Sequence, residues 1–209
     1  MRPESYRTVR SEGRGEYEEK KSRFLALVRP VATEEEAREM LASVRAAHPD
    51  ARHHVFAYLT DFSSVQRMSD DGEPQGTGGT QLMEPMQRKG YTNLCLVVTR
   101  YFGGTLLGAG PLARAYGKAA RLALEDAGEA EYRLQARYEY RVPYALQKRA
   151  EYELAKKGAL LAPPAFGEEV TLTFTVLLEE KEEIERFCFD LSAGKSRAVL
   201  LDESFRPMQ

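Results

Sequence analysis

The stretch Leu134-Gln-Ala-Arg-Tyr-Glu-Tyr-Arg-Val142 decides the fold of the last third of this chain. Its apolar side chains alternate with polar ones, which is the period of a strand with one buried face. Residues 144–157 then show helical spacing, and Gly158 fits the position just after a helix. Four further segments complete the pattern: a short strand at 159–161, a β-rich run at 170–178, a helix at 182–193 and a strand at 197–205. The order β-α-β-β-α-β predicts a ferredoxin-like domain.

The residues before this domain predict a mixed α/β unit. Strands are expected at 22–29, 53–60 and 93–102, and helices at 33–45, 80–88 and 111–127. Thr33 and Glu36 have the spacing of a capping box, whereas Pro85 is expected to shorten or kink its helix. Residues 61–79 are rich in Ser, Asp and Gly and are expected to form a long loop. We therefore expect an α+β protein with a two-layer α/β domain at 1–130 and a ferredoxin-like domain at 131–209.

Composition narrows the function classes. The 209 residues carry 30 Lys and Arg against 32 Asp and Glu, a net charge of −2 that excludes a polycation but leaves room for a local basic site. No apolar run approaches the ~18 residues of a membrane span, and the polar N-terminus predicts no signal peptide. The two cysteines, Cys95 and Cys188, lie in apolar stretches and are expected in the core, so a reducing cytoplasmic location is expected.

The most informative stretch for function is Arg100-Tyr-Phe-Gly-Gly-Thr-Leu-Leu-Gly-Ala-Gly-Pro-Leu-Ala-Arg-Ala-Tyr116. An apolar strand runs into a glycine-rich loop, and Pro111 suits the start of a helix. Free backbone N–H groups at such a helix start favour an anion such as phosphate. The pattern matches neither a P-loop nor a dinucleotide-binding fingerprint. The alternative is that the glycines only mark tight turns.

A basic helix face follows the glycines. Arg114, Lys118 and Arg121 are four and three residues apart and so share one face of the expected helix. No acidic residue occurs between Pro85 and Leu124. This local excess of positive charge indicates a phosphate-binding surface, although a solvated helix face gives the same pattern.

The loop Ser69-Asp-Asp-Gly-Glu-Pro74 brings three carboxylates together. Asp70 and Asp71 are candidate ligands for Mg²⁺ or Ca²⁺, although the spacing is not that of an EF-hand. A solvated turn is one alternative, and acids that order arginines such as Arg52 or Arg100 are another. No cofactor is expected.

Two histidines, His53 and His54, open a strand close to this loop in the sequence. Adjacent strand residues point to opposite faces, so this pair is not expected to bind one metal together. One of the two histidines is a candidate hydrogen-bonding or acid–base group.

Five motifs together resemble the YigZ/IMPACT family in order and spacing. They are Ala51–His54, Ser69–Thr77, Thr99–Gly104, Leu107–Gly110 and Arg114–Tyr116. The chain departs from the family pattern at two places. It has Gly78-Gly-Thr-Gln81 where Ala-Gly-Lys-Pro is common, and Gly110-Pro-Leu112 where Gly-Gly-Leu is common. The first change removes a lysine that could touch phosphate.

The resemblance implies a fold similar to domains IV and V of elongation factor G. The eukaryotic relatives act in translational control through a partner protein, and nucleic-acid binding is usually inferred for the bacterial ones. The resemblance therefore implies a translation-associated regulator that binds RNA or the ribosome, with a possible protein partner and no membrane. The C-terminal domain is expected to bind or position without chemistry.

The expected binding cleft gathers residues from all of these motifs: Arg52, His53, His54, Asp70, Asp71, Glu73, Arg100, Tyr101, Gly103, Gly104, Gly108, Gly110, Arg114, Tyr116 and Lys118. Within it, phosphate contacts are expected from Arg52, Arg100, Arg114 and Lys118. Tyr101 or Tyr116 is expected to stack on a base. Two alternatives stay open: an enzyme acting on a phosphorylated small molecule with Mg²⁺ at Asp70–Glu73, and a protein-interaction adaptor.

Overall fold

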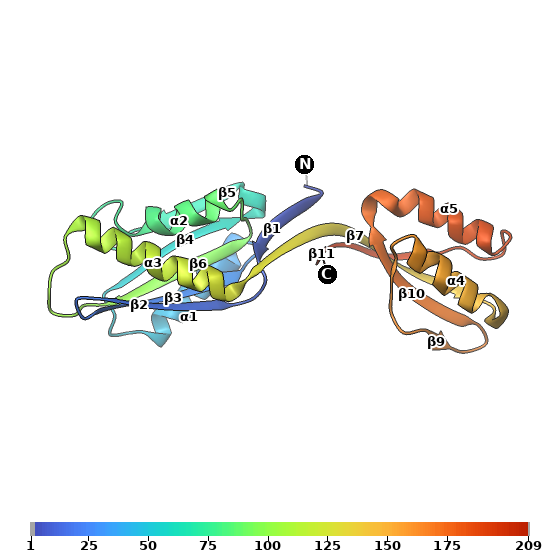
Figure 1. Ribbon diagram of the computed structural model, residues 1–209, viewed down its shortest axis with the longest axis horizontal. Helices are drawn as coiled ribbons and strands as arrows, with labels where there is room; N and C mark the ends of the chain where they lie inside the picture. The colour runs from blue at the N-terminus through green and yellow to red at the C-terminus, as the bar shows by residue number, and fades with distance from the viewer. Residues whose placement is uncertain (1–2, 209) are drawn as a thin grey trace. The chain divides into compact units, whose positions relative to one another are not determined.

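The computed structural model describes residues 3–208. They form two compact units that meet in the sequence between Glu131 and Tyr132. Each unit has its own hydrophobic core, and the order of the elements along the chain can be followed in Figure 1. Among the described residues, no helix combines the length and apolar character needed to cross a membrane.

The N-terminal unit contains a five-stranded antiparallel sheet in the order β2-β3-β6-β4-β5. Its elements are β1 (Ser5–Val9), β2 (Gly13–Glu19), β3 (Ser22–Pro30), α1 (Glu34–Ala47), β4 (His53–Thr60), β5 (Val65–Ser69), α2 (Gly79–Arg88), β6 (Leu94–Tyr101) and α3 (Ala109–Ala127). Thr33 caps α1 by accepting the Glu36 N–H at 3.3 Å, and the Glu36 carboxylate accepts the Ala32 N–H.

Two expectations for this unit need correction. Residues 61–79 are not one long loop, because they contain a 3₁₀ turn at Asp61–Ser63 and the edge strand β5. Among residues 3–208, β5 pairs only with β4, and its sequence has little apolar patterning, so the sequence did not reveal it. Helix α3 begins at Ala109, so Pro111 is the third helical residue and not the first.

Helices cover both faces of this sheet, so a second helical layer is added to the expected arrangement of one sheet and one helical layer. Helices α2 and α3 pack on one face, against residues such as Phe24 and Leu96. Helix α1 packs on the other face, against Cys95 and Val97. Because it lies between these layers, β6 is buried along seven of its eight residues. The loop and helix that follow β6 are therefore held by a rigid strand.

The close packing of β2 on α3 depends on glycine. A Cβ atom on Gly15 would lie 2.6 Å from the backbone oxygen of Ala119, and one on Gly13 would collide with Ala123. The strand can therefore lie directly on the helix backbone. This contact fixes α3 over β2, the edge strand of the sheet (Figure 1).

The C-terminal unit has the predicted ferredoxin-like fold. Its elements are β7 (Glu129–Val142), α4 (Tyr144–Lys156), β8 (Leu160–Leu161), β9 (Ala165–Phe166), β10 (Val170–Leu177), a 3₁₀ turn (Leu178–Glu180), α5 (Lys181–Leu191) and β11 (Val199–Pro207). The strands are antiparallel in the order β11-β7-β10-β8, with β9 as an extra short pairing on β10. Cys188 in α5 and Cys95 in β6 are both buried, as predicted.

Candidate functional site

The acidic loop closes over the start of β4. Asp71 has φ +46°, and its carboxylate accepts the His54 backbone N–H at 2.7 Å and an Arg45 N–H at 3.1 Å. The Nδ1 atom of His53 lies 2.8 Å from the Asp71 carbonyl oxygen. Burial lowers the pKa of His54 below its ordinary value, which favours the neutral ring. Asp71 therefore fastens the loop to the sheet and to α1.

Asp70 fastens the other end of the loop. Its carboxylate accepts backbone N–H groups from Gly76 at 2.9 Å and from Gly78 and Gly79 at 2.8 Å. Burial alone raises the pKa of Asp70, but the three N–H donors outweigh burial and hold this pKa below 3.8. Asp70 thus places a negative charge at the start of α2, where the helix dipole favours it.

Glu73 lies deeper, in a buried cluster with Arg100 and Tyr116. Its Oε1 accepts an Arg100 N–H at 2.7 Å and the Tyr116 hydroxyl at 2.7 Å. Burial, followed by the Glu73 charge, raises the pKa of Tyr116 above its ordinary value. The cluster ties the acidic loop to β6 and α3.

This cluster corrects two of the expected roles. Arg100 is only 7% exposed and already paired, so it is not available for phosphate. Tyr116 is completely buried and cannot stack on a base. The glycine-rich stretch and the family resemblance placed both residues in the site, and neither reveals which side chains another loop covers.

The carboxylates of Asp70 and Glu73 are occupied by protein hydrogen-bond donors. Asp70 receives three N–H donors, and Glu73 receives a guanidinium and a hydroxyl. Within residues 3–208, no group of three His, Cys, Asp or Glu side chains is arranged to hold a metal ion. The alternative that the loop acids hold nearby arginines in place agrees with the pairing of Arg100 and of Arg45. It does not apply to Arg52, which is exposed.

The glycine-rich loop has two different halves. A Cβ atom on Gly103 would collide with the backbone of Lys21, and the Gly103 N–H donates to Ser22 Oγ at 3.1 Å. Gly103 is therefore required by packing. Gly108 and Gly110 have ordinary room for a Cβ atom, and Gly108 caps α3 without a side-chain hydrogen bond. At this helix start, the Arg114 guanidinium lies 3.4 Å from the Cβ position of Gly110.

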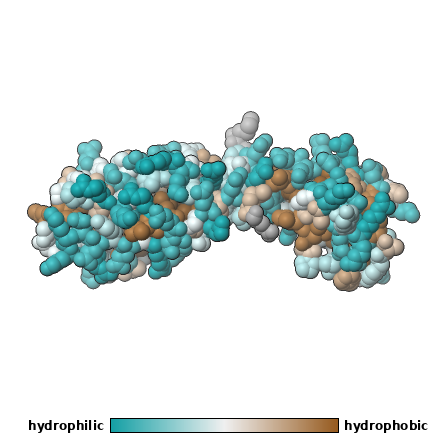
Figure 2. Space-filling model, viewed as in Figure 1, coloured by the Kyte–Doolittle hydropathy of each residue, from teal (hydrophilic) through white to brown (hydrophobic). Residues whose placement is uncertain are grey.

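Three basic side chains lie along the exposed surface of α3. Arg114, Lys118 and Arg121 are exposed and form no ion pair with the residues that the structure describes. By contrast, Arg23, Arg29 and Arg38 each pair with a carboxylate at 2.6–2.9 Å. The face of the N-terminal unit that carries α3 is largely hydrophilic (Figure 2).

The remaining expected site residues lie apart from this cluster. The Tyr101 hydroxyl lies 2.9 Å from Nδ1 of His48, at the end of α1. Gly104 has φ +84° in the exposed loop before α3. Arg52 is exposed just before β4.

The fold and these contacts define a two-domain α+β protein with an α/β unit followed by a ferredoxin-like unit. The model of the Impact N-terminal domain matches residues 20–124, and a domain of unknown function (DUF1949) matches residues 141–195. IMPACT family member YvyE of Bacillus subtilis is 36% identical over 195 residues, which cover 92% of this chain and 89% of that protein. The chain belongs to the IMPACT family.

Two further similarities agree with this assignment. IMPACT family member YigZ of Escherichia coli is 41% identical over 128 residues, which cover 57% of this chain and 63% of that protein. A crystal structure described as a hypothetical protein is 30% identical, with a TM-score of 0.63 over 97% of this chain and 100% of that chain. Family membership supports a general translation-associated regulatory role.

Proposed function

We propose that the N-terminal unit binds RNA, free or within the ribosome, through the exposed basic face of α3. The observation that carries this proposal is the unpaired state of Arg114, Lys118 and Arg121, since most cations on other elements have a carboxylate partner. Long cationic side chains without a partner are ready to contact phosphate, and each such contact releases counterions.

The loop before α3 extends this surface. Gly108 and Gly110 leave the helix start open, and the backbone N–H groups there favour an anion. Lys20 and Lys21 are exposed at the β2–β3 turn, and the Gly103 contact brings that turn next to the loop. Positive charge therefore borders the helix start as well as the helix face.

Phosphate contacts of this kind position a nucleic acid without reading its sequence. In this function the acidic loop and its Glu73–Arg100–Tyr116 cluster hold α3 in place and do not touch the ligand. Asp70, Asp71, His53 and His54 have the same supporting role.

The test is binding of the full-length protein to structured RNA and to ribosomes at low salt. Arg114→Ala and Lys118→Ala should each weaken binding to several RNA sequences about equally. Arg38→Ala is the matched control, because Arg38 is exposed on α1, which covers the opposite face of the sheet. Equal loss in all three variants, or no binding by the unmodified protein, would exclude α3 as the contact surface.

A further inference from the structure

A groove lies on the other face of the N-terminal sheet, where α1 leaves two strands uncovered. Helix α1 packs over β4 and β6 and against Leu27 of β3, and leaves the rest of β2 and β3 largely uncovered on this face. Leu25 and Leu27 of β3 are consequently only half-buried, whereas Phe24, Ala26 and Val28 on the opposite side are buried. The resulting space is about 640 Å³, which is in the range of small-ligand pockets.

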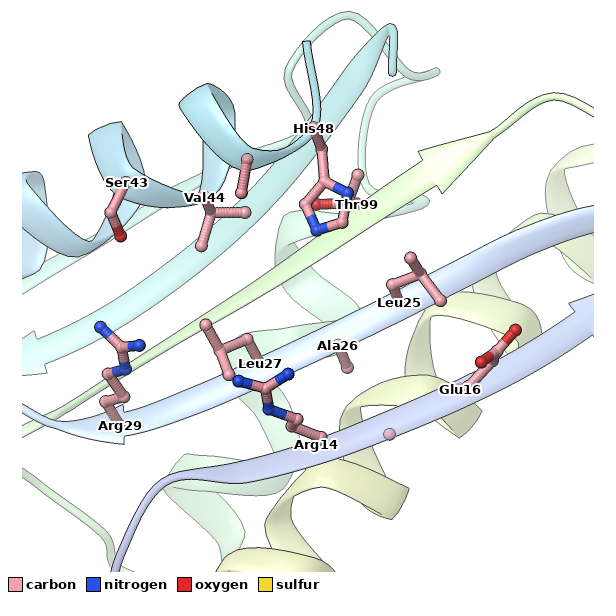
Figure 3. Close-up of a pocket in the computed structure, with 12 residues that line it drawn as sticks. Arg14, Glu16, Leu25, Ala26, Leu27, Arg29, Ser43, Val44, His48 and Thr99 are labelled. Atoms are coloured by element: carbon pink, nitrogen blue, oxygen red, sulfur yellow. The ribbon is translucent and has the colours of Figure 1, made fainter. Parts of the chain in front are cut away.

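The floor and one wall of the groove are apolar. Leu25 and Leu27 form the floor, and Val44 of α1 lies on the wall (Figure 3). Ala47 of the same helix also lines the groove. This surface suits the hydrocarbon or aromatic body of a ligand, because apolar atoms there would leave water on binding.

One end of the groove carries an excess of positive charge. Arg14 of β2 and Arg29 of β3 share a single carboxylate, that of Glu12. Both of its oxygens are used, at 2.8 and 2.6 Å. Terminal N–H groups of both guanidiniums remain without a partner among residues 3–208. Two guanidiniums with one shared anion can accept a second anion between them.

The other end holds a buried polar atom with no partner. Thr99 lines the groove and is 1% exposed, and its hydroxyl oxygen makes no hydrogen bond within the described part of the chain. His48 lies beside it (Figure 3). An unsatisfied buried hydroxyl is costly, and a ligand group that reached it would remove that cost.

We propose that this groove binds a small amphipathic acid that carries a polar group at the end opposite its carboxylate. The acid group lies between Arg14 and Arg29, the apolar body covers Leu25 and Leu27, and the distal polar group bonds to the Thr99 hydroxyl. The groove and the basic face of α3 lie on opposite faces of the sheet, so the two proposed sites share no surface.

The first experiment asks whether the groove binds an amphipathic anion. The fluorescent probe anilinonaphthalene sulfonate is titrated into the full-length protein and then displaced with octanoate, ω-hydroxyoctanoate or octanol. We expect saturable binding at one site, with both acids displacing the probe at lower concentration than octanol. No saturable binding, or equal displacement by octanol, would overturn the proposal.

The second experiment places the site with a matched pair of variants. Ala47→Phe fills the groove from α1, whereas Ala46→Phe adds the same group to the same helix at a neighbouring exposed residue that does not line the groove. Ala47→Phe should abolish displacement by the acids and Ala46→Phe should not. Arg14→Gln should weaken both acids by about three- to tenfold, with Arg38→Gln as its control. If Ala47→Phe and Ala46→Phe affected displacement equally, the groove would not be the binding site. The same holds if Arg14→Gln and Arg38→Gln weakened the acids equally.

The third experiment tests the Thr99 contact. The unmodified protein should prefer ω-hydroxyoctanoate to octanoate by about two- to tenfold, the contribution of one neutral hydrogen bond. Thr99→Val should remove this preference and leave octanoate affinity unchanged. A variant that keeps the preference, or a protein without one, would show that the hydroxyl does not receive the ligand.

Discussion

Glu73 and Arg100 form a buried ion pair in which Oε1 lies 2.7 Å from a terminal guanidinium nitrogen, with the two side chains 4% and 7% exposed. The Tyr116 hydroxyl donates to the same carboxylate oxygen. A loop, a central strand and α3 are therefore joined at one carboxylate. The basic face of α3 depends on this cluster for its position, although the cluster itself is closed to ligands.

Breaking this pair should be costly. Glu73→Gln leaves a guanidinium buried without its counter-charge, and we expect a loss of about 3–5 kcal/mol in the free energy of unfolding. Denaturant unfolding of the full chain measures it. Glu84→Gln, which removes an exposed pair with Arg88, should cost only about 0–1 kcal/mol. Similar losses in the two variants would contradict the buried cluster.

The Asp70 contacts predict a pH-dependent contribution to stability. Asp70→Asn should cost about 1–3 kcal/mol near neutral pH, because a charged acceptor of three N–H groups is lost. The folded-state pKa of Asp70 lies below 3.8. Its contribution is therefore complete above about pH 4 and disappears as the pH falls through the folded-state pKa.

Thermal unfolding of the unmodified protein and Asp70→Asn is compared at about pH 6.5 and over a series of pH values below about 4. The difference in stability should be large at neutral pH and should shrink as the pH falls through the folded-state pKa of Asp70. Asp50→Asn, at an exposed residue of the same unit, is the control. A difference that grows on acidification would have the wrong sign for this account.

Two glycines should respond in opposite directions to the same substitution. Gly15→Ala places a methyl group 2.6 Å from the α3 backbone, and we expect a loss of about 1–3 kcal/mol or more. Gly110→Ala lies in the first turn of α3 with room for the methyl group, and should gain up to about 1 kcal/mol. Melting temperatures distinguish the two, and destabilisation by both would show that α3 is packed differently.

The ferredoxin-like unit could be read from the sequence because its strands alternate cleanly, as residues 170–177 do. The first two strands, β1 and β2, could not be predicted in this way. On the side of β2 that faces α3, Gly13 and Gly15 stand where an ordinary strand has apolar side chains, because the helix backbone lies too close for them. Strand β5 was missed for a different reason: as an edge strand it is mostly exposed and polar.

The candidate site was only partly predictable for a similar reason. Spacing placed Arg114 and Lys118 on one helix face, and both are exposed. The same spacing gives no sign that Glu73 reaches Arg100, since 27 residues separate them in the sequence. The groove beside α1 also escaped prediction, because it exists only where that helix stops short of β2 and β3.

An acidic residue at the N-cap of α3 should lower RNA affinity without lowering the stability of the fold. Gly108 has the extended backbone of an N-cap residue, so Gly108→Asp should keep or slightly raise the melting temperature. The added carboxylate competes with phosphate for the helix start, and RNA affinity should fall by about three- to tenfold. Gly108→Asn is the uncharged control and should retain more affinity. Unchanged RNA binding by Gly108→Asp would exclude the helix start from the interface.

The salt dependence of RNA binding tests the central claim most directly. Affinity of the unmodified protein is measured over a range of salt concentrations, together with Arg114→Ala, Lys118→Ala and the control Arg38→Ala. If the face of α3 contacts phosphate, each of the first two variants should make the log–log slope shallower by roughly 0.7–0.9, and the control should keep the original slope. Unchanged slopes in the two α3 variants, or an unmodified protein that binds RNA with no salt dependence, would contradict the account.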